Sequence, residues 1–424
     1  MVLEALTGKN VLLLQGPVGF FFKNFAEDLA AIGAQVFKIN FNGGDHFFYK
    51  EGVSYYGSLT NFAAFVQNFV KKNNIHSVML FGDCRPIHVQ ARKALAGFPL
   101  EWYVFEEGYL RPNHITCERE GVNGHSQLPE KARKYLKNYG QEQSLSSDVV
   151  EVGRTFWYAA YWAVLYYLFA SFYHYQYRQY QHHRPLTLRE AWPWLKSGYR
   201  KYVFKLKELG VEQYLLEQKS KQYFLVPLQT HNDAQIHFHS PYQSIEQFIE
   251  EVMTSFAQHA PKDVLLVLKQ HPFDRGYKDY TRLIEQLSQK LEIQARVFYI
   301  HDQYLPNLLE NSRGVIVINS TVGMSAVESL IPVKVCGTAV YDIEKMTLQC
   351  DLNQFWTRAE SWRVNKNIVK RYMYYLQHTT QFNGSFYRKI QQTDNYSGVI
   401  WSQRIALSVE NKNVHSIHSL LNVK

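Results

Sequence analysis

Two short polar stretches in the second half of the chain follow apolar runs and carry groups suited to binding a phosphate. Val264–Leu268 is predicted to be a strand buried on both faces, and it ends in Lys269-Gln270-His271-Pro272. Val315–Ile318 is a second such run, followed by Asn319-Ser320-Thr321, Gly323 and a helical pattern. A Ser-Thr pair before a helix is more often an N-cap than a phosphate ligand. Ligands nevertheless bind at the carboxyl ends of parallel strands, so we predict a nucleotide-phosphate site at two neighbouring strand ends.

Two adjacent carboxylates follow another predicted strand, in the first half of the chain. Tyr103–Phe105 is apolar and leads into Glu106-Glu107-Gly108. Carboxylates at a strand end beside a glycine are candidates for the general base that deprotonates a hydroxyl, although a solvated turn has the same appearance. The earlier loop Gln15–Gly19 lacks the G-x-G-x-x-G spacing and a Walker lysine, which argues against a dinucleotide or ATP site.

Composition favours an anionic partner without choosing among the classes of partner. The net charge is +9, which suits nucleic acid, anionic lipid or a phosphorylated substrate. The 30 Tyr and 27 Phe exceed what packing needs and suit sugar stacking or a membrane interface. The four cysteines show no close pair, so neither a CxxC metal site nor a disulfide framework is predicted, and a reducing compartment fits best. The amino terminus shows no secretory signal.

The order of predicted elements indicates two α/β domains. At 424 residues the chain is too long for one ordinary domain. Residues 1–150 open as βαβ, and a second βα series occupies residues 221–366. We expect two Rossmann-like domains that face each other across a cleft. Residues 367–424 are predicted to form helices that cross back to the first domain.

Residues 151–220 differ in character from both predicted domains. The stretch from Thr155 to Tyr177 holds no Asp, Glu, Lys or Arg and is rich in aromatic side chains. Its length could nominally span a bilayer, but polar residues crowd its second half and basic residues flank both ends. A membrane-interfacial helix and an internally packed helix are both favoured over a span. The residues that follow are strongly basic, and Trp192 and Trp194 are candidate interface anchors.

Five motifs, taken in order, resemble the capsule polysaccharide biosynthesis proteins of Gram-negative bacteria. They are QGPVG, EEGYLRP, LQTHNDAQI, KQHP and NSTVG, and together they cover nearly the whole chain. Among these proteins the chain is most similar to the single-module retaining β-Kdo transferases. The resemblance implies a GT-B architecture and CMP-β-Kdo as donor. It also implies transfer of the first Kdo to phosphatidylglycerol or its lyso form, at the cytoplasmic face of the inner membrane and beside other capsule biosynthesis proteins.

The resemblance also assigns roles to residues of this chain. The family's HP motif falls on His271-Pro272 and its Ser/Thr motif on Ser320-Thr321, which then contact the CMP phosphate. The aspartate of a Q-x-x-x-D segment falls on Asp233, which becomes the candidate nucleophile; an Asx turn or helix cap is the alternative. Glu106 or Glu107 becomes the base. The donor site is expected to include Gln229, Lys269, Asn319, Gly323 and Glu328, and the acceptor site Gly16, Pro17, Arg85, Tyr109 and Arg111.

Charge on the departing CMP must be met by an imidazolium, a lysine or helix amides if no metal takes part. His271, Lys269 and the Asn319–Thr321 turn supply these three groups, and Arg85, Arg111 and Arg275 are candidates for the Kdo carboxylate. The sequence has no D-x-D at a strand end and no His/Asp cluster with metal spacing, so we predict a metal-independent enzyme without cofactor. The alternatives are a non-catalytic export or assembly component, or a transferase for another CMP-sugar such as CMP-sialic acid. A nucleic-acid partner is not expected, because the basic residues follow no groove-reading motif.

Overall fold

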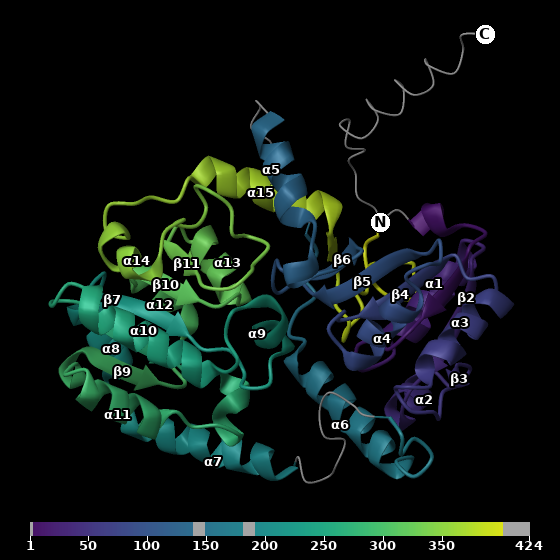
Figure 1. The fold of residues 1–424 in the computed structure, drawn as a ribbon, viewed down its shortest axis with the longest axis horizontal. Helices are drawn as coiled ribbons and strands as arrows, with labels where there is room; N and C mark the ends of the chain where they lie inside the picture. Colours follow the sequence, from purple (N-terminus) through teal and green to yellow (C-terminus); the bar gives the residue numbers. More distant parts are fainter. Residues whose placement is uncertain (1–2, 139–148, 181–190, 402–424) are drawn as a thin grey trace.

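The computed structural model describes residues 3–138, 149–180 and 191–401 of the chain. These residues form two α/β halves, each built on its own sheet, and Figure 1 shows them side by side. Both halves therefore match the predicted α/β class, with predominantly parallel sheets.

Within the described residues the N-terminal half contains a sheet in the order β12-β6-β5-β4-β1-β2-β3. Neighbours from β3 across to β5 pair in parallel, whereas β6 and β12 join antiparallel. The strands are β1 (Asn10–Leu13), β2 (Gln35–Asn40), β3 (Val53–Ser54), β4 (Ser77–Phe81), β5 (Glu101–Glu107), β6 (His114–Arg119) and β12 (Gln381–Asn383). The helices that connect them are α1 (Phe21–Ala31), α2 (Gly43–Phe48), α3 (Phe62–Lys72) and α4 (Pro86–Ala94).

The C-terminal half contains an all-parallel sheet in the order β11-β10-β7-β8-β9. Its strands are β7 (Tyr223–Pro227), β8 (Leu265–Lys269), β9 (Val297–Ile300), β10 (Gly314–Val317) and β11 (Val333–Val335). Its helices are α9 (Ala234–His239), α10 (Ile245–His259), α11 (Thr281–Lys290), α12 (Leu305–Asn311), α13 (Thr321–Glu328) and α14 (Leu352–Arg358).

The strand order corrects one expectation about the phosphate site. Strands β8 and β10 carry the two polar stretches, but β7 lies between them rather than the two being neighbours. The residues that follow β7 include Gln229 and Asp233. Three adjacent strand ends therefore meet at this edge of the sheet, and Asp233 follows the central one.

The C-terminal part of the described chain returns to the N-terminal half. Helix α15 (Lys366–Thr379) leads directly into β12, which pairs with β6. Helix α5 (Leu128–Asn138) packs against α15, and Figure 1 shows both helices between the two halves. One apolar core is shared across this joint, because Tyr109, Leu128 and Tyr135 belong to the same cluster as the C-terminal sheet. The part of the predicted helical region 367–424 that covers residues 402–424 lies outside the described residues.

The aromatic segment divides between the two halves. Helix α6 (Phe156–Phe172) lies on α2, where Phe169 stacks on Phe47 with ring centroids 3.7 Å apart. Helix α7 (Ala191–Lys207) lies on the short helix η5 (Pro272–Gly276) of the C-terminal half. Figure 1 shows α6 and α7 along the same edge of the molecule. Among the described residues, no helix has both the length and the apolar character that crossing a bilayer requires.

Candidate active site

Asp233 caps the start of α9, six positions after the central strand β7 ends at Pro227. One carboxylate oxygen accepts a hydrogen bond from the Gln235 amide at 2.9 Å, and the other accepts from Gln229 Nε2 at 3.0 Å. The side chain is half-buried. The helix cap expected as an alternative is therefore present, and it holds the carboxylate of Asp233 in a fixed direction.

Asn319 fixes α9 to the neighbouring strand end. Its side-chain oxygen accepts from Gln229 Nε2 at 2.9 Å, and its amide nitrogen donates to the Gln235 carbonyl at 3.1 Å. Both ends of the side chain are thus engaged with protein groups. Asn319 positions the Gln229–Asp233 turn, whereas the sequence predicted that it would contact the sugar-nucleotide donor itself.

His271 caps η5 at the end of β8. Its Nδ1 accepts from the Phe273 amide at 3.2 Å, which leaves Nε2 to carry the ring proton. Burial lowers the pKa of His271 to about 4; Asp233 opposes this shift, whereas Lys269 and Arg111 reinforce it. The expected imidazolium is therefore corrected to a neutral imidazole that donates from Nε2.

A buried carboxylate that the sequence did not reveal ties the two adjacent strand ends together. Asp274 accepts from the His231 amide at 2.8 Å and contacts His231 Nδ1 at 2.6 Å. Burial raises the pKa of Asp274, and the bonds from His231 oppose that shift. The pair lies 43 positions apart, so no local spacing could have indicated it.

Ser320 and Gly323 shape the helix start that follows β10. Ser320 Oγ accepts from the Val322 amide at 3.2 Å, and Thr321 is the first residue of α13. A side chain at Gly323 would meet the Tyr341 hydroxyl at 2.2 Å, and that hydroxyl donates to the Ser320 carbonyl. Glycine therefore lets Tyr341 brace the turn whose amides suit a phosphate.

The N-terminal half places Glu106 and Glu107 in different environments. Tyr387 donates a hydrogen bond to Glu107, which binds that carboxylate to the C-terminal segment. Glu106 instead accepts from the Glu107 amide at 3.0 Å and from Asn123 Nδ2 at 3.4 Å. Burial raises the pKa of Glu106 to about 7; the Glu107 amide and Arg85 oppose the shift. Glu106 therefore has the properties of a general base near neutral pH.

Arg85 and Arg111 are two cations of the N-terminal half that were expected in the site. The Arg85 guanidinium donates to the Gly16 carbonyl at 3.1 Å and lies 5.1 Å from the centre of the Phe81 ring. Gly16 has no space for a side chain, because one would meet Phe22 at 2.7 Å. Arg111 donates to the Gly108 carbonyl at 3.0 Å, and its charge lowers the pKa of His271 across the cleft.

A small cavity lies between the two halves beside these residues. It is lined by Tyr109 and Asn123 from one half and by Asn319 and Thr321, among others, from the other. Tyr109 is buried, and its hydroxyl donates to Glu118 at 2.8 Å and accepts from the Asn123 amide at 2.7 Å. Pro17 is buried behind the first strand end, and Pro272 is exposed.

Three of the residues expected to contact the donor sugar nucleotide bond other protein groups or lie farther along a helix. Lys269 donates to the His301 carbonyl at 2.6 Å, and burial lowers its pKa to about 8. Arg275 forms an ion pair with Asp302. Glu328 ends α13, about 10 Å along the helix from Thr321 at 1.5 Å per residue. A buried cation needs a carbonyl or carboxylate partner close by, and the sequence alone does not show which partner that is.

Comparison with known proteins identifies the chain at the level of its family. The family described as capsule polysaccharide biosynthesis protein matches residues 76–387. The chain belongs to this family. The capsule polysaccharide export protein KpsS of Escherichia coli is 36% identical over 390 residues, covering 90% of this chain and 98% of KpsS. The capsule polysaccharide modification protein LipB of Neisseria meningitidis serogroup B is also 36% identical, covering 91% of this chain and 93% of LipB.

Two solved structures are similar to this member of the capsule family over most of its length. KpsC of Thermosulfurimonas dismutans, a beta Kdo 2,7 transferase, shares 12% identity with a TM-score of 0.45, covering 88% of this chain and 92% of KpsC. Anabaena HepE in complex with UDP shares 11% identity with a TM-score of 0.34, covering 97% and 100%. The family resemblance drawn from the five motifs is confirmed.

Proposed function

We propose that this capsule family member is a retaining β-Kdo transferase that uses CMP-β-Kdo as donor. Its acceptor is phosphatidylglycerol or the lyso form, and the product begins the poly-Kdo linker of a capsular polysaccharide. The observation that carries the proposal is the Asp233 carboxylate, which Gln229 and the Gln235 amide hold in place and whose charge acts on His271. Family membership and the KpsS and LipB similarities support the capsule context.

The first displacement uses Asp233 and the two flanking strand ends. The Asp233 carboxylate attacks the anomeric carbon of Kdo, and the bond to the phosphate oxygen breaks with its electron pair leaving on CMP. His271 donates from Nε2 to the phosphate, and the amides at the start of α13 meet its growing charge. Ser320 contributes its hydroxyl hydrogen, because its oxygen already accepts from the Val322 amide.

The second displacement uses the N-terminal half. Glu106 takes the proton from the acceptor hydroxyl, whose oxygen attacks the anomeric carbon as the Asp233 carboxylate leaves. Two inversions at one carbon give net retention. We propose that Arg111 and Arg85 meet the Kdo carboxylate. In this scheme the chain's own residues supply every charge, so we propose that the transfer step needs no metal or cofactor.

We also propose that α6 and α7 lie on the membrane surface that holds the acceptor. Trp157 and Phe172 on α6 are 74% and 77% exposed, and Trp192 and Tyr199 on α7 are 71% and 72% exposed. Helix α7 also carries Lys196, Arg200, Lys201, Lys205 and Lys207. Exposed aromatic side chains beside cations suit an anionic headgroup layer. This arrangement supports a peripheral location at the inner face of the inner membrane, near other capsule proteins.

The direct test is a transfer assay with a fluorescent phosphatidylglycerol acceptor. CMP-Kdo, generated in situ, is expected to give a Kdo-lipid, while CMP-sialic acid gives no product. Product from CMP-sialic acid alone would replace the donor assignment. A folded chain that forms no product with either donor would contradict transferase activity and favour the export role named for KpsS.

A further inference from the structure

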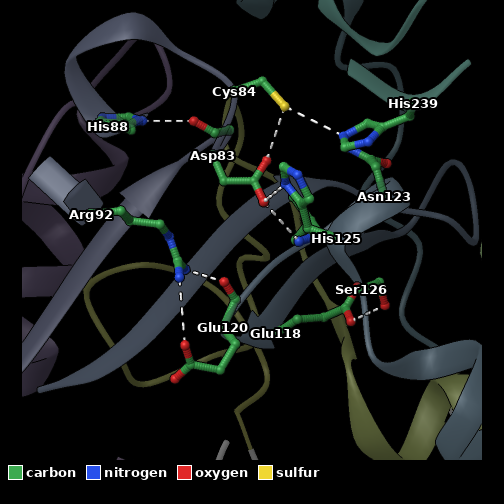
Figure 2. A network of polar contacts seen from close by, with 12 residues as sticks. Asp83, Cys84, His88, Arg92, Glu118, Glu120, Asn123, His125, Ser126 and His239 are labelled. Carbon is green, nitrogen blue, oxygen red and sulfur yellow. Dashed lines mark hydrogen bonds and ion pairs between the residues drawn. The ribbon is translucent and has the colours of Figure 1, made fainter. Parts of the chain in front are cut away.

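Four side chains of the types that bind transition metals meet at the joint between the two halves. They are Asp83, Cys84 and His125 from the N-terminal half and His239 from α9, and their ligand atoms all lie within 4.8 Å of one another. Cys84 Sγ lies 3.4 Å from His239 Nε2, and His125 Nδ1 lies 3.1 Å from Asp83 Oδ2. Figure 2 shows the four side chains pointing toward one another.

The fold builds this cluster with tight backbone packing. A side chain at Gly124 would meet the His239 ring at 2.3 Å, so glycine allows His125 and His239 to approach. The two imidazole rings stand edge to face with centroids 4.5 Å apart. The Val122 amide donates to Asp83 at 3.2 Å and fixes one carboxylate oxygen. The Thr338 amide donates to the His239 carbonyl at 2.8 Å and holds the end of α9.

The ligand set and its burial suit zinc. Zinc binds thiolate, imidazole and carboxylate in a tetrahedron, with bonds of about 2.0–2.3 Å that place ligand atoms roughly 3.3–3.8 Å apart. Two of the separations, 3.4 Å and 3.1 Å, already lie near that range. Asp83, Cys84 and His239 are buried, whereas the His125 side chain is 52% exposed and leaves an entry path.

We propose that Asp83, Cys84, His125 and His239 bind one Zn²⁺ that fastens the two halves of the molecule together. The role is structural. The metal would hold α9, which begins at Asp233 and ends at His239, against the turn that carries Arg85. Zinc would therefore stabilise the closed cleft. This inference concerns metal binding alone and does not depend on the identity of the sugar donor.

The test uses the full-length protein stripped with a chelator and then titrated with Co²⁺ as a spectroscopic substitute for zinc. One equivalent per chain is expected to give visible bands of tetrahedral cobalt and a near-ultraviolet thiolate charge-transfer band. Zn²⁺ is then expected to displace the cobalt and to raise the Tm by several degrees, since it binds the folded chain only. A folded wild-type protein without the thiolate band would overturn the proposal, whatever the variants do.

Matched variants assign the ligands. Cys84→Ser is expected to lose the charge-transfer band, while Cys336→Ser, altering a thiol that lines the same hollow as His239, keeps it. His239→Gln is expected to weaken Co²⁺ binding by at least roughly tenfold, while His237→Gln on the exposed face of α9 leaves it unchanged. Equal spectra and affinities for Cys84→Ser and the wild type would also overturn the assignment.

Discussion

At the scale of single residues, the site separates groups that look equivalent in the sequence. Glu106 and Glu107 are adjacent, yet alternation along β5 sends one towards Asn123 and the other to Tyr387. His271 and Lys269 were both expected to meet the phosphate as cations. Burial makes the histidine neutral and turns the lysine to the His301 carbonyl. In the proposed mechanism, the departing CMP would thus be stabilised by hydrogen bonds and helix amides more than by formal positive charge.

The pKa of Glu106 predicts the pH dependence of transfer. Because burial raises this pKa to about 7, the carboxyl is protonated below that pH and does not act as a base. The value of kcat/KM for the lipid acceptor, which reports the second displacement, is therefore expected to rise about tenfold per pH unit up to pH 7 and then level off. Steady-state transfer rates between pH 5 and 9 measure this profile.

Variants of the two glutamates serve as the control for that profile. Glu106→Gln is expected to lower the rate by roughly 10²–10⁴-fold and to remove the rise in rate up to pH 7. Glu107→Gln, which retains a partner for Tyr387, is expected to keep the rise in rate up to pH 7. If the pH-dependent rise in rate disappears with Glu107→Gln and stays with Glu106→Gln, the base is Glu107 instead.

At the scale of elements, three strand ends of the C-terminal sheet converge on one turn-rich edge. Helix α9 is held at its start by Asp233 and through its length by Asn319, and η5 is tied to the same edge by Asp274. The start of α13 depends on Tyr341 packing over Gly323. The position of each turn therefore depends on contacts with its neighbours.

Gly323→Ala tests the packing at the start of α13. The added methyl group would lie 2.2 Å from the Tyr341 hydroxyl, so the buried ring must shift. We expect the free energy of unfolding to fall by about 1–3 kcal/mol, even though alanine favours helix. Denaturant unfolding followed by circular dichroism measures the change.

Gly198→Ala is the matched control for that substitution. Gly198 lies within α7, and a side chain there meets nothing within 4 Å. The free energy of unfolding is expected to stay constant or to rise by up to about 1 kcal/mol. Equal effects at the two glycines would show that Tyr341 does not constrain Gly323.

The helices and strands could be predicted from the sequence much better than the order of the strands in the sheet or the contacts between distant residues. The apolar runs predicted at Tyr103–Phe105 and Val264–Leu268 fall on strands β5 and β8, because a buried strand leaves a local signal. The placement of β7 between β8 and β10 was missed, since strand order carries no local signal. The approach of Cys84 to His239, 155 positions away, was missed for the same reason.

At the scale of the whole molecule, two halves with separate sheets share one joint. The apolar cluster around Tyr109 and Tyr135, the return of the chain through β12, and the contact between Cys84 and His239 all cross it. Helices α6 and α7 attach to different halves, yet both lie along one edge. Trp162 lies in the same aromatic helix as the exposed Trp157, but it packs inward and donates to the Tyr387 carbonyl at 3.1 Å.

Removing two exposed tryptophans tests the proposed membrane surface. Trp157→Ala combined with Trp192→Ala is expected to weaken binding to phosphatidylglycerol vesicles by roughly tenfold or more, because both indoles lose apolar contact area. Sedimentation with vesicles measures the affinity. Tyr396→Ala is the control, since Tyr396 is 52% exposed and lies on neither helix; its backbone amide donates to Asp28 of α1. Unchanged binding by the double variant would contradict the surface assignment.

The most direct test of the double displacement is intact-protein mass spectrometry for a covalent Kdo on Asp233. Glu106→Gln is used with CMP-Kdo, because the first displacement then proceeds while the second is slowed. A Kdo adduct that maps to Asp233 is expected, and with the wild-type protein the Kdo is expected to move to the lipid. Asp233→Asn, which keeps the helix cap, is expected to form no adduct. Kdo-lipid made by Asp233→Asn at the wild-type rate would contradict the double displacement.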